Sequence, residues 1–352
     1  MSRRARTRVR QRGATSVFFA LLLVFVVGGI LALVVDVGHF WLVRSELQNA
    51  ADAAALAGVR DLNGLATQFP FAITSAQTYG GANRADGTAV TVPLTDVTLG
   101  KWDLTNKTFT PTLLKAHTVN AVRVTTRRTA ATGNAVEAYF GPLLGIEEQD
   151  ITATAIAVGG GPSATCGFVL ALPSCSVLDA FGNLNCNATL SFNSNGNNAA
   201  FTLLSLTVPN TPDLECAMWC TLNSLLGVQL PLLGGSCSCS PGGCKSTSVK
   251  TQIAISNGTN LSSSMIVYIQ SALALSPNGL RVDLPIFDVP LCPSGNLSNV
   301  QTVAGYVKTR ITGATGAPNK SISVSVDCAA TTSSRPSQEL FGYKSTEVYL
   351  VR

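Results

Sequence analysis

The chain has 352 residues, of which 46% are hydrophobic and 12% charged, a composition that can bury a core and excludes a wholly disordered protein. The net charge is +5, but six arginines lie in the first twelve residues, namely Arg3, Arg4, Arg6, Arg8, Arg10 and Arg12. Subtracting them from +5 leaves −1, so the main body offers no basic surface of the kind that binds nucleic acid.

A run of 23 residues without a charge, Gly13 to Val35, follows the arginines. As a helix it would be roughly 30 Å long or slightly more, enough to cross a bilayer. A cleavable secretory signal has an apolar region of only about 7 to 15 residues, and no convincing A-x-A cleavage site follows this run. We therefore expect a retained single-pass anchor, with a cleaved signal as the alternative. The arginines predict a cytoplasmic N-terminal tail (residues 1–12) near anionic lipid headgroups.

Helical character continues beyond the apolar run. Apolar and alanine residues recur at spacings of three and four, which predicts one helix from about Ala14 to Gly58, comprising the anchor and a stem (residues 13–58). The alanine-rich outer half could pack on partner helices or dock on the chain's own domain. Asp36, at the outer end of the apolar run, is expected to contact either water or a partner helix.

The stretch "RGATSVFFALLLVFVVGGILALVVDVGHFWLVRSELQNAADAAALAG" resembles the N-terminal module of TadE/TadG-like Flp pilus-assembly proteins, especially the TadG-like branch. Its second half closely matches that branch's pattern D-x-G-x-x-x-x-x-R-x-x-L-Q-x-A-A-D-A-A-A-L-A-G. The residues that match, and that the resemblance implies as assembly contacts, are Asp36, Gly38, Arg44, Leu47, Gln48, Ala50, Ala51, Asp52, Ala53, Ala54, Ala55, Leu56, Ala57 and Gly58. A weaker likeness continues to "ITATAIAVGG".

The resemblance implies a non-enzymatic component of a Flp (tight-adherence) pilus assembly system in the bacterial cytoplasmic membrane, with its outer domains in the periplasm or outside. Its expected partners are the membrane and other pilus-assembly proteins or pilin-like helices, and a surface ligand is left open. The alternative is a minor pilin or tip adhesin. Two features depart from related families: Phe18 stands where a prepilin cut after Gly13 would have glutamate, and the D-x-S-x-S metal motif is missing.

The pattern of apolar and polar residues in 59–158 predicts a small α+β domain. Residues 71–83 read as a helix, and residues 88–94, 96–102, 107–111, 121–128 and 151–158 read as strands. Residues 134–145 read as a short helix broken by Pro142. The segment "GGGPS", residues 159–163, predicts a linker.

Residues 164–352 predict a mostly β outer domain, with strands at 189–194, 201–208, 251–257, 303–312, 321–328 and 346–351. All ten cysteines lie in it: Cys166, Cys175, Cys186, Cys216, Cys220, Cys237, Cys239, Cys244, Cys292 and Cys328. An even number outside the membrane predicts disulfides, whose pairing the spacing does not assign. A zinc site within residues 216–244 is the alternative. The overall fold class is therefore α+β, with an anchor helix, a stem and a disulfide-rich outer domain.

No catalytic, metal or cofactor site is predicted. His39 lies at the edge of the span, and His117 reads as an ordinary loop residue, although it could be the base of an unrecognised, membrane-tethered enzyme. Asp283 and Asp288 lie beside two prolines, which suggests solvated acids on an extended edge segment.

Overall fold

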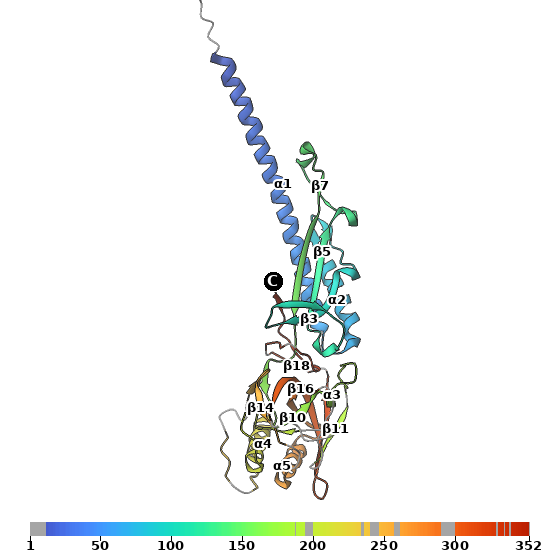
Figure 1. Ribbon diagram of the computed structural model, residues 1–352, viewed down its shortest axis with the longest axis vertical. Coiled ribbons are helices and arrows are strands. Elements are labelled where there is room, and N and C mark those ends of the chain that lie inside the picture. The colour runs from blue at the N-terminus through green and yellow to red at the C-terminus, as the bar shows by residue number, and fades with distance from the viewer. Residues whose placement is uncertain are drawn as a thin grey trace, which may run out of the picture.

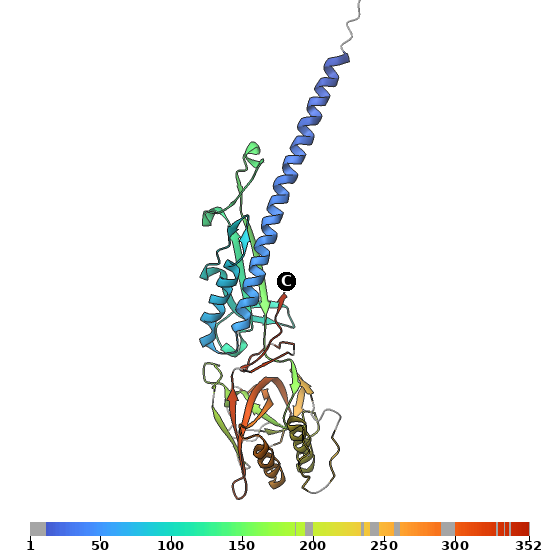
Figure 2. The ribbon, with the colours of Figure 1, turned by 180° about the vertical axis from the view of Figure 1, so that it is seen from behind.

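A helix of 50 residues, α1 (Arg12–Asp61), projects from two folded units stacked end to end (Figures 1 and 2). The predicted continuous helix is confirmed, since α1 has no break between its apolar first half and the stem. The computed structural model describes residues 12–186, 188–193, 200–233, 236–239, 246–256, 261–289, 300–328, 330–333, 335–337 and 339–351.

Gly58 does not end the helix as predicted. It lies within α1 at the contact with helix α2 (Phe69–Gly81), where an added Cβ would come within 2.9 Å of the Ala72 carbonyl oxygen. The glycine is therefore explained by close packing of two helices and not by a helix stop.

The first unit is a five-stranded antiparallel sheet covered by α2 and by the lower half of α1, the part that follows the uncharged run and begins at Asp36. Its order is β20-β8-β5-β3-β4, with bounds β3 (Val97–Asp103), β4 (Thr108–Pro111), β5 (Ala121–Arg128), β8 (Ile151–Val158) and β20 (Tyr349–Val351). The predicted helix at 71–83 and four of the predicted strands are thus confirmed, whereas in residues 88–94 only the first two form a strand.

Short 3-10 helices, labelled η, and short strands connect the strands of this sheet and the helices on it. They are η1 (Ala66–Gln68), β1 (Arg84–Ala85), β2 (Thr88–Ala89), η2 (Leu94–Asp96), η3 (Ala116–Thr118), η4 (Ala130–Thr132), β6 (Val136–Glu137), η5 (Gly141–Leu144) and β7 (Glu148–Gln149).

Of the short helix predicted at 134–145, only the 3-10 turn η5 (Gly141–Leu144) is present, because the rest of the segment forms one arm of the β6–β7 hairpin. The Ala138 amide donates to the Glu147 carbonyl across the neck of the hairpin. At the tip, an added Cβ on Gly141 would come within 2.3 Å of the Ile146 carbonyl oxygen. Pairing across the hairpin thus overrides the local helix preference, while Pro142 stands in the first turn of η5, where its missing amide hydrogen has no cost.

The second unit is a seven-stranded sheet with helices α4 (Thr211–Leu226) and α5 (Ser263–Leu275) at the end farthest from α1 (Figure 1). Its strands run in the order β11-β17-β16-β15-β10-β12, with β14 also paired to β16. The bounds are β10 (Leu170–Pro173), β11 (Thr189–Asn193), β12 (Ala200–Phe201), β14 (Gln252–Ala254), β15 (Leu280–Phe287), β16 (Val300–Thr315) and β17 (Ser321–Asp327).

The remaining elements of this part of the chain are β9 (Ala164–Cys166), α3 (Ser174–Val177), β13 (Ser246–Ser248), β18 (Ala330–Thr332) and β19 (Tyr343–Ser345). Strands β11, β14, β16 and β17 fall where they were predicted, whereas residues 201–208 contribute only the end of β12.

The sequence interpretation did not predict α4 and α5. Both begin at a conventional cap, in which the side chain of Asn210 or Ser262 accepts a bond from an amide three residues later. Gly227 ends α4 with φ +65°. Asparagine, serine and glycine also mark the turns of this region, so these caps do not by themselves distinguish a helix start from a turn.

The interpretation of Asp283 as a solvated edge acid is wrong. Asp283 is buried in β15, between β16 and β10, and it accepts hydrogen bonds from Thr165, Lys308 and Tyr343. Pro285 is tolerated in this interior strand because β10 pairs with β15 only at Ile286 and Phe287.

The C-terminal segment returns from the second unit to the first. Strand β20 pairs with β8, so the last residues do not stay in the outer domain that was expected to run to 352. The returning segment covers the glycines of the predicted linker: the amides of Ser337 and Ser345 donate to the carbonyls of Gly161 and Gly160. An added Cβ on Gly160 would come within 1.8 Å of the Ser337 carbonyl oxygen.

Candidate functional site

The upper half of α1 presents apolar side chains to its surroundings on all sides. The large hydrophobic residues from Val17 to Val35 are 45 to 77% exposed. In the described part of the chain, α1 is the one helix long and apolar enough to cross a membrane. An exposed apolar surface of this length is stable in lipid and unfavourable in water, so α1 has the properties of a single membrane anchor.

The arginines expected to set the orientation lie around the start of the described chain. Arg12 is the first residue of α1. Arg3, Arg4, Arg6, Arg8 and Arg10 lie outside the described residues.

Asp36 marks the point where α1 meets the folded chain. Its carboxylate is 6% exposed and accepts hydrogen bonds from the amides of Tyr139, at 2.9 Å, and Phe140, at 3.1 and 3.2 Å. The partner of Asp36 is therefore neither of the two predicted, water or another helix, but the chain's own β6–β7 hairpin. A carboxylate that accepts amide hydrogen bonds is a strong anchor for such a loop.

A second polar cluster fixes the adjacent β1–β2 hairpin to α1. The Nε2 atom of His39 lies 3.1 Å from Asp86, and Arg128 donates to the same carboxylate at 3.0 Å. The Glu46 carboxylate accepts the Asp86 amide at 2.7 Å. His39 therefore has a structural partner, and its ring also lies 4.8 Å from that of Tyr139.

Half of the fourteen family-like helix residues are buried, and all of these except Asp36 lie in the stem. Leu47, Ala50, Ala51, Ala54 and Ala55 are fully buried, and Gly58 is buried with them. Of the two predicted arrangements for the stem, the structure shows the one docked on the chain's own domain.

The other members of the pattern lie nearer the surface. Asp52, Ala53, Leu56 and Ala57 are half-buried, Gly38 and Arg44 are exposed, and Gln48 donates to Asp52 and to the Thr154 carbonyl. Hence the exposed positions are the ones left for contact with another molecule.

Disulfides hold the second unit together, as predicted. The described pairs are Cys186–Cys328, Cys216–Cys237 and Cys220–Cys239. Cys166 and Cys175 are also disulfide-bonded, while Cys244 and Cys292 lie outside the described residues. The zinc alternative fails, because four of its five ligands are paired as disulfides, and no cluster that could hold a metal occurs among the described residues.

A cavity of about 890 Å³ lies at the junction of the two units. His117 lies in its wall, where its Nδ1 is 2.8 Å from the Gly182 carbonyl oxygen and its ring stacks on Phe341. Burial lowers the pKa of His117, while burial raises the pKa of Glu339 on the same wall to about 7. Ser174, also on this wall, donates to Asp288 and to the Val289 carbonyl. The polar groups of the wall therefore bond to other parts of the chain and hold the junction together.

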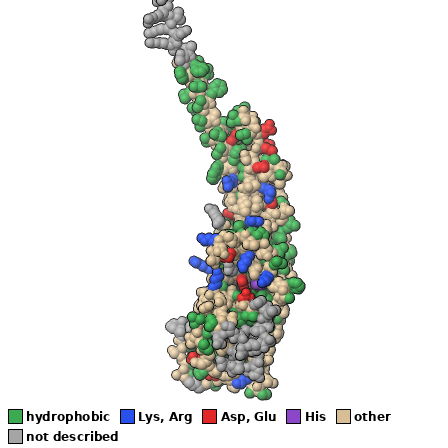
Figure 3. Space-filling model, viewed as in Figure 1, with side chains coloured by type: hydrophobic (Ala, Val, Ile, Leu, Met, Phe, Trp, Pro, Cys, Tyr) green, Lys and Arg blue, Asp and Glu red, His purple; other side chains and the backbone are tan. Residues whose placement is uncertain are grey.

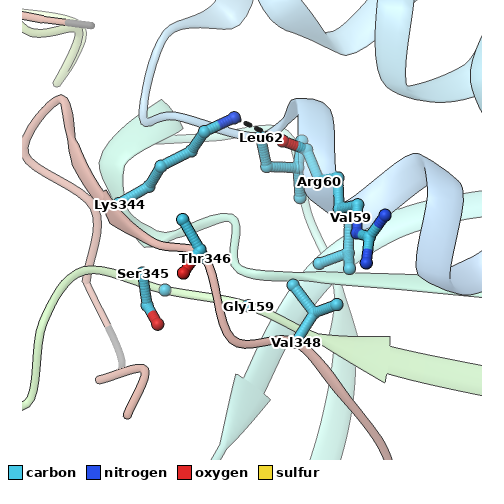
Figure 4. A pocket seen from close by; sticks show the side chains of 9 residues that line it. Val59, Arg60, Leu62, Gly159, Lys344, Ser345, Thr346 and Val348 are labelled. Atoms are coloured by element: carbon cyan, nitrogen blue, oxygen red, sulfur yellow. Dashed lines mark hydrogen bonds between the residues drawn. The ribbon is translucent and has the colours of Figure 1, made fainter. Parts of the chain in front are cut away.

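A smaller cavity of about 310 Å³ lies between the end of α1 and the returning C-terminal segment (Figure 4). Lys344 crosses it and donates to the carbonyl of Arg60, while Val59 and Val348 point toward each other (Figure 4). This contact ties the base of the stem to the chain's C-terminal end.

Comparison with known proteins agrees with this division of the molecule. Residues 13–61, nearly all of α1, match the family described as putative Flp pilus-assembly TadE/G-like. Residues 42–157, which hold most of the stem and four of the five strands of the first unit, match the family described as putative Tad-like Flp pilus-assembly. No curated protein and no solved structure matches the chain. The two matches overlap on the stem and together span residues 13–157, so the anchor helix, the stem and most of the first unit are similar to TadE/TadG-like Flp pilus-assembly proteins.

Proposed function

We propose that the chain is a non-enzymatic component of a Flp-type pilus assembly system, which holds two folded units at the outer face of the bacterial cytoplasmic membrane and acts through protein–protein contacts. The observation that carries this proposal is the single helix α1: its upper half is exposed and apolar, while its lower half forms part of the core of the Tad-like unit. Because the helix is continuous, a force on the outer units is transmitted directly to the anchor.

Two independent features support an orientation with the N-terminus in the cytoplasm. Six arginines precede the span, and positive charge is retained on the cytoplasmic side. The disulfides of the second unit need an oxidising compartment, which the periplasm provides.

The exposed side of the stem next to the anchor is the surface that we assign to other pilus-assembly proteins or pilin-like helices. Trp41 is 69% exposed there, with Leu42 and Arg44 beside it in the chain. A large aromatic ring with a neighbouring arginine is typical of protein interfaces.

Two measurements test the proposal: the position of the mature N-terminus, and the number of surface filaments on cells that lack the chain. We expect intact mass and terminal sequencing to find the full arginine tail on protein from the membrane fraction, and cells lacking the chain to lose surface filaments. Normal filament numbers in those cells would contradict the assembly role. A chain that begins at Ala14 in sheared fibres would instead make it a minor pilin or tip adhesin.

A further inference from the structure

The tip of the β6–β7 hairpin is an apolar surface that no part of the described chain covers. Tyr139, Leu143, Leu144 and Ile146 are 51 to 83% exposed within eight consecutive residues. Tip side chains of this kind are usually polar in a loop that faces only water. The concentration of large apolar groups therefore indicates a second, apolar environment.

The hairpin lies beside the anchor. In both views it extends from the first unit along α1 toward the helix's N-terminal end (Figures 1 and 2). Asp36, directly after the last residue of the uncharged run, binds the amides of Tyr139 and Phe140 at the start of the hairpin's tip. In Figure 3, hydrophobic side chains accordingly continue from the helix onto the adjacent end of the folded body, with acidic side chains next to them.

Several backbone amides of the tip are already hydrogen-bonded within the protein and need no water. The amides of Leu143, Gly145 and Ile146 bond to carbonyls within the loop, and Pro142 has no amide hydrogen. Asp36 accepts hydrogen bonds from the amides of Tyr139 and Phe140. Unpaired amides are costly in lipid, so each of these hydrogen bonds lowers the free-energy cost of insertion.

We propose that the hairpin tip, residues 139–146, inserts into the outer leaflet of the membrane that α1 spans, as a second lipid contact clamped to the anchor by Asp36. The proposal rests on the proposed membrane anchoring of α1. Glu147 and Glu148 follow the tip and are exposed, so they would meet the headgroup region. Their charge favours a zwitterionic lipid surface over an anionic one.

Quenching of tryptophan fluorescence by brominated phosphatidylcholine tests this contact in the full chain reconstituted into vesicles. The background substitution W41F removes the exposed tryptophan, and Trp102 and Trp219 are buried. Three probes are then compared: L143W at the tip, V24W in the anchor, and L275W at the exposed end of α5.

We expect L143W and V24W to lose most of their added fluorescence, and L275W to lose none. Quenching of V24W without L143W would overturn the hairpin contact and leave the anchor intact. Failure of both probes would instead overturn the anchor itself. A blue-shifted but unquenched L143W would mean that protein covers the tip, which also overturns the lipid contact.

Discussion

At the residue scale, Asp36 does the most to connect the anchor to the folded chain. Its carboxylate reaches across 104 positions of sequence to the amide of Phe140 and is nearly excluded from solvent. A buried carboxylate needs such donors, because desolvation of an unpaired charge is costly. The family-like aspartate therefore has a structural explanation within one chain.

Replacing Asp36 by Asn should loosen the hairpin. The amide side chain loses the negative charge and presents a donor to one of the two backbone amides, which costs about 1–3 kcal/mol of local stability. We expect faster hydrogen exchange at Tyr139 and Phe140 in the full chain in detergent micelles. E137Q, which removes a charge from an exposed hairpin residue, should leave both amides unchanged. Equal exchange in D36N and the parent chain would refute the clamp.

At the scale of the element, small residues let α1 enter the first unit. Ala54 and Gly80 face each other between α1 and α2, and an added Cβ on Gly80 would come within 3.1 Å of the Ala54 Cβ. Small side chains thus allow the two helix backbones to approach closely. The alanine-rich stretch is the buried face of the stem, because its partner is in the same chain.

A larger side chain at this contact should destabilise the unit. Ala54 has no exposed surface, so A54L must displace α2 and should lower the free energy of unfolding by about 1–3 kcal/mol. Chemical unfolding of the full chain in micelles, followed by circular dichroism, measures this. N49L adds a leucine to the exposed face of the same helix and should change stability by less than about 0.5 kcal/mol. Equal effects would contradict the packing explanation.

At the scale of the whole molecule, the returning C-terminal segment joins the two units. The Leu340 amide donates to the His117 carbonyl, and the Gly342 amide donates to that of Asn63. Glu339 precedes these contacts on the wall of the junction cavity. Burial raises its pKa from the ordinary 4.5 to about 7, with Asp288 adding to the rise and Lys101 and Lys115 opposing it.

The raised pKa of Glu339 predicts that the stability of the folded chain depends on pH. Between pH 4.5 and about 7 the folded chain holds a proton on Glu339 that the unfolded chain has lost, so its contribution to stability falls as pH rises through this window. The loss is on the order of 2 kcal/mol once solvent screening of a half-buried group is allowed for. His117 acts in the opposite sense, since its lowered pKa costs stability as pH falls below its ordinary 6.5.

The substitution E339Q should remove the decline in stability that accompanies the rise in pH. Relative to the parent chain, the variant should gain stability steadily between pH 4.5 and about 7, as measured by urea midpoints at each pH. The control E148Q changes an exposed glutamate of the hairpin and should follow the parent chain. The same pH slope in E339Q and the parent would contradict the assignment.

Local patterns in the sequence determined the anchor, the continuous helix and most strands of both sheets. The uncharged run sets the length of the apolar segment, and alternating residues such as those of 121–128 and 151–158 match the pleat. The even number of cysteines after residue 163 indicates the disulfides of the second unit. The family-like residues were also recognisable, because they lie together on one helix.

What these residues contact was decided only by the tertiary structure. Asp36 meets Tyr139, the alanines of the stem meet α2, and β20 pairs with β8, each through a partner distant in sequence. The helix predicted at 134–145 became a hairpin because cross-strand and carboxylate hydrogen bonds outweighed local propensity. Periodicity reports which face of an element is apolar, but only the folded chain determines what covers that face.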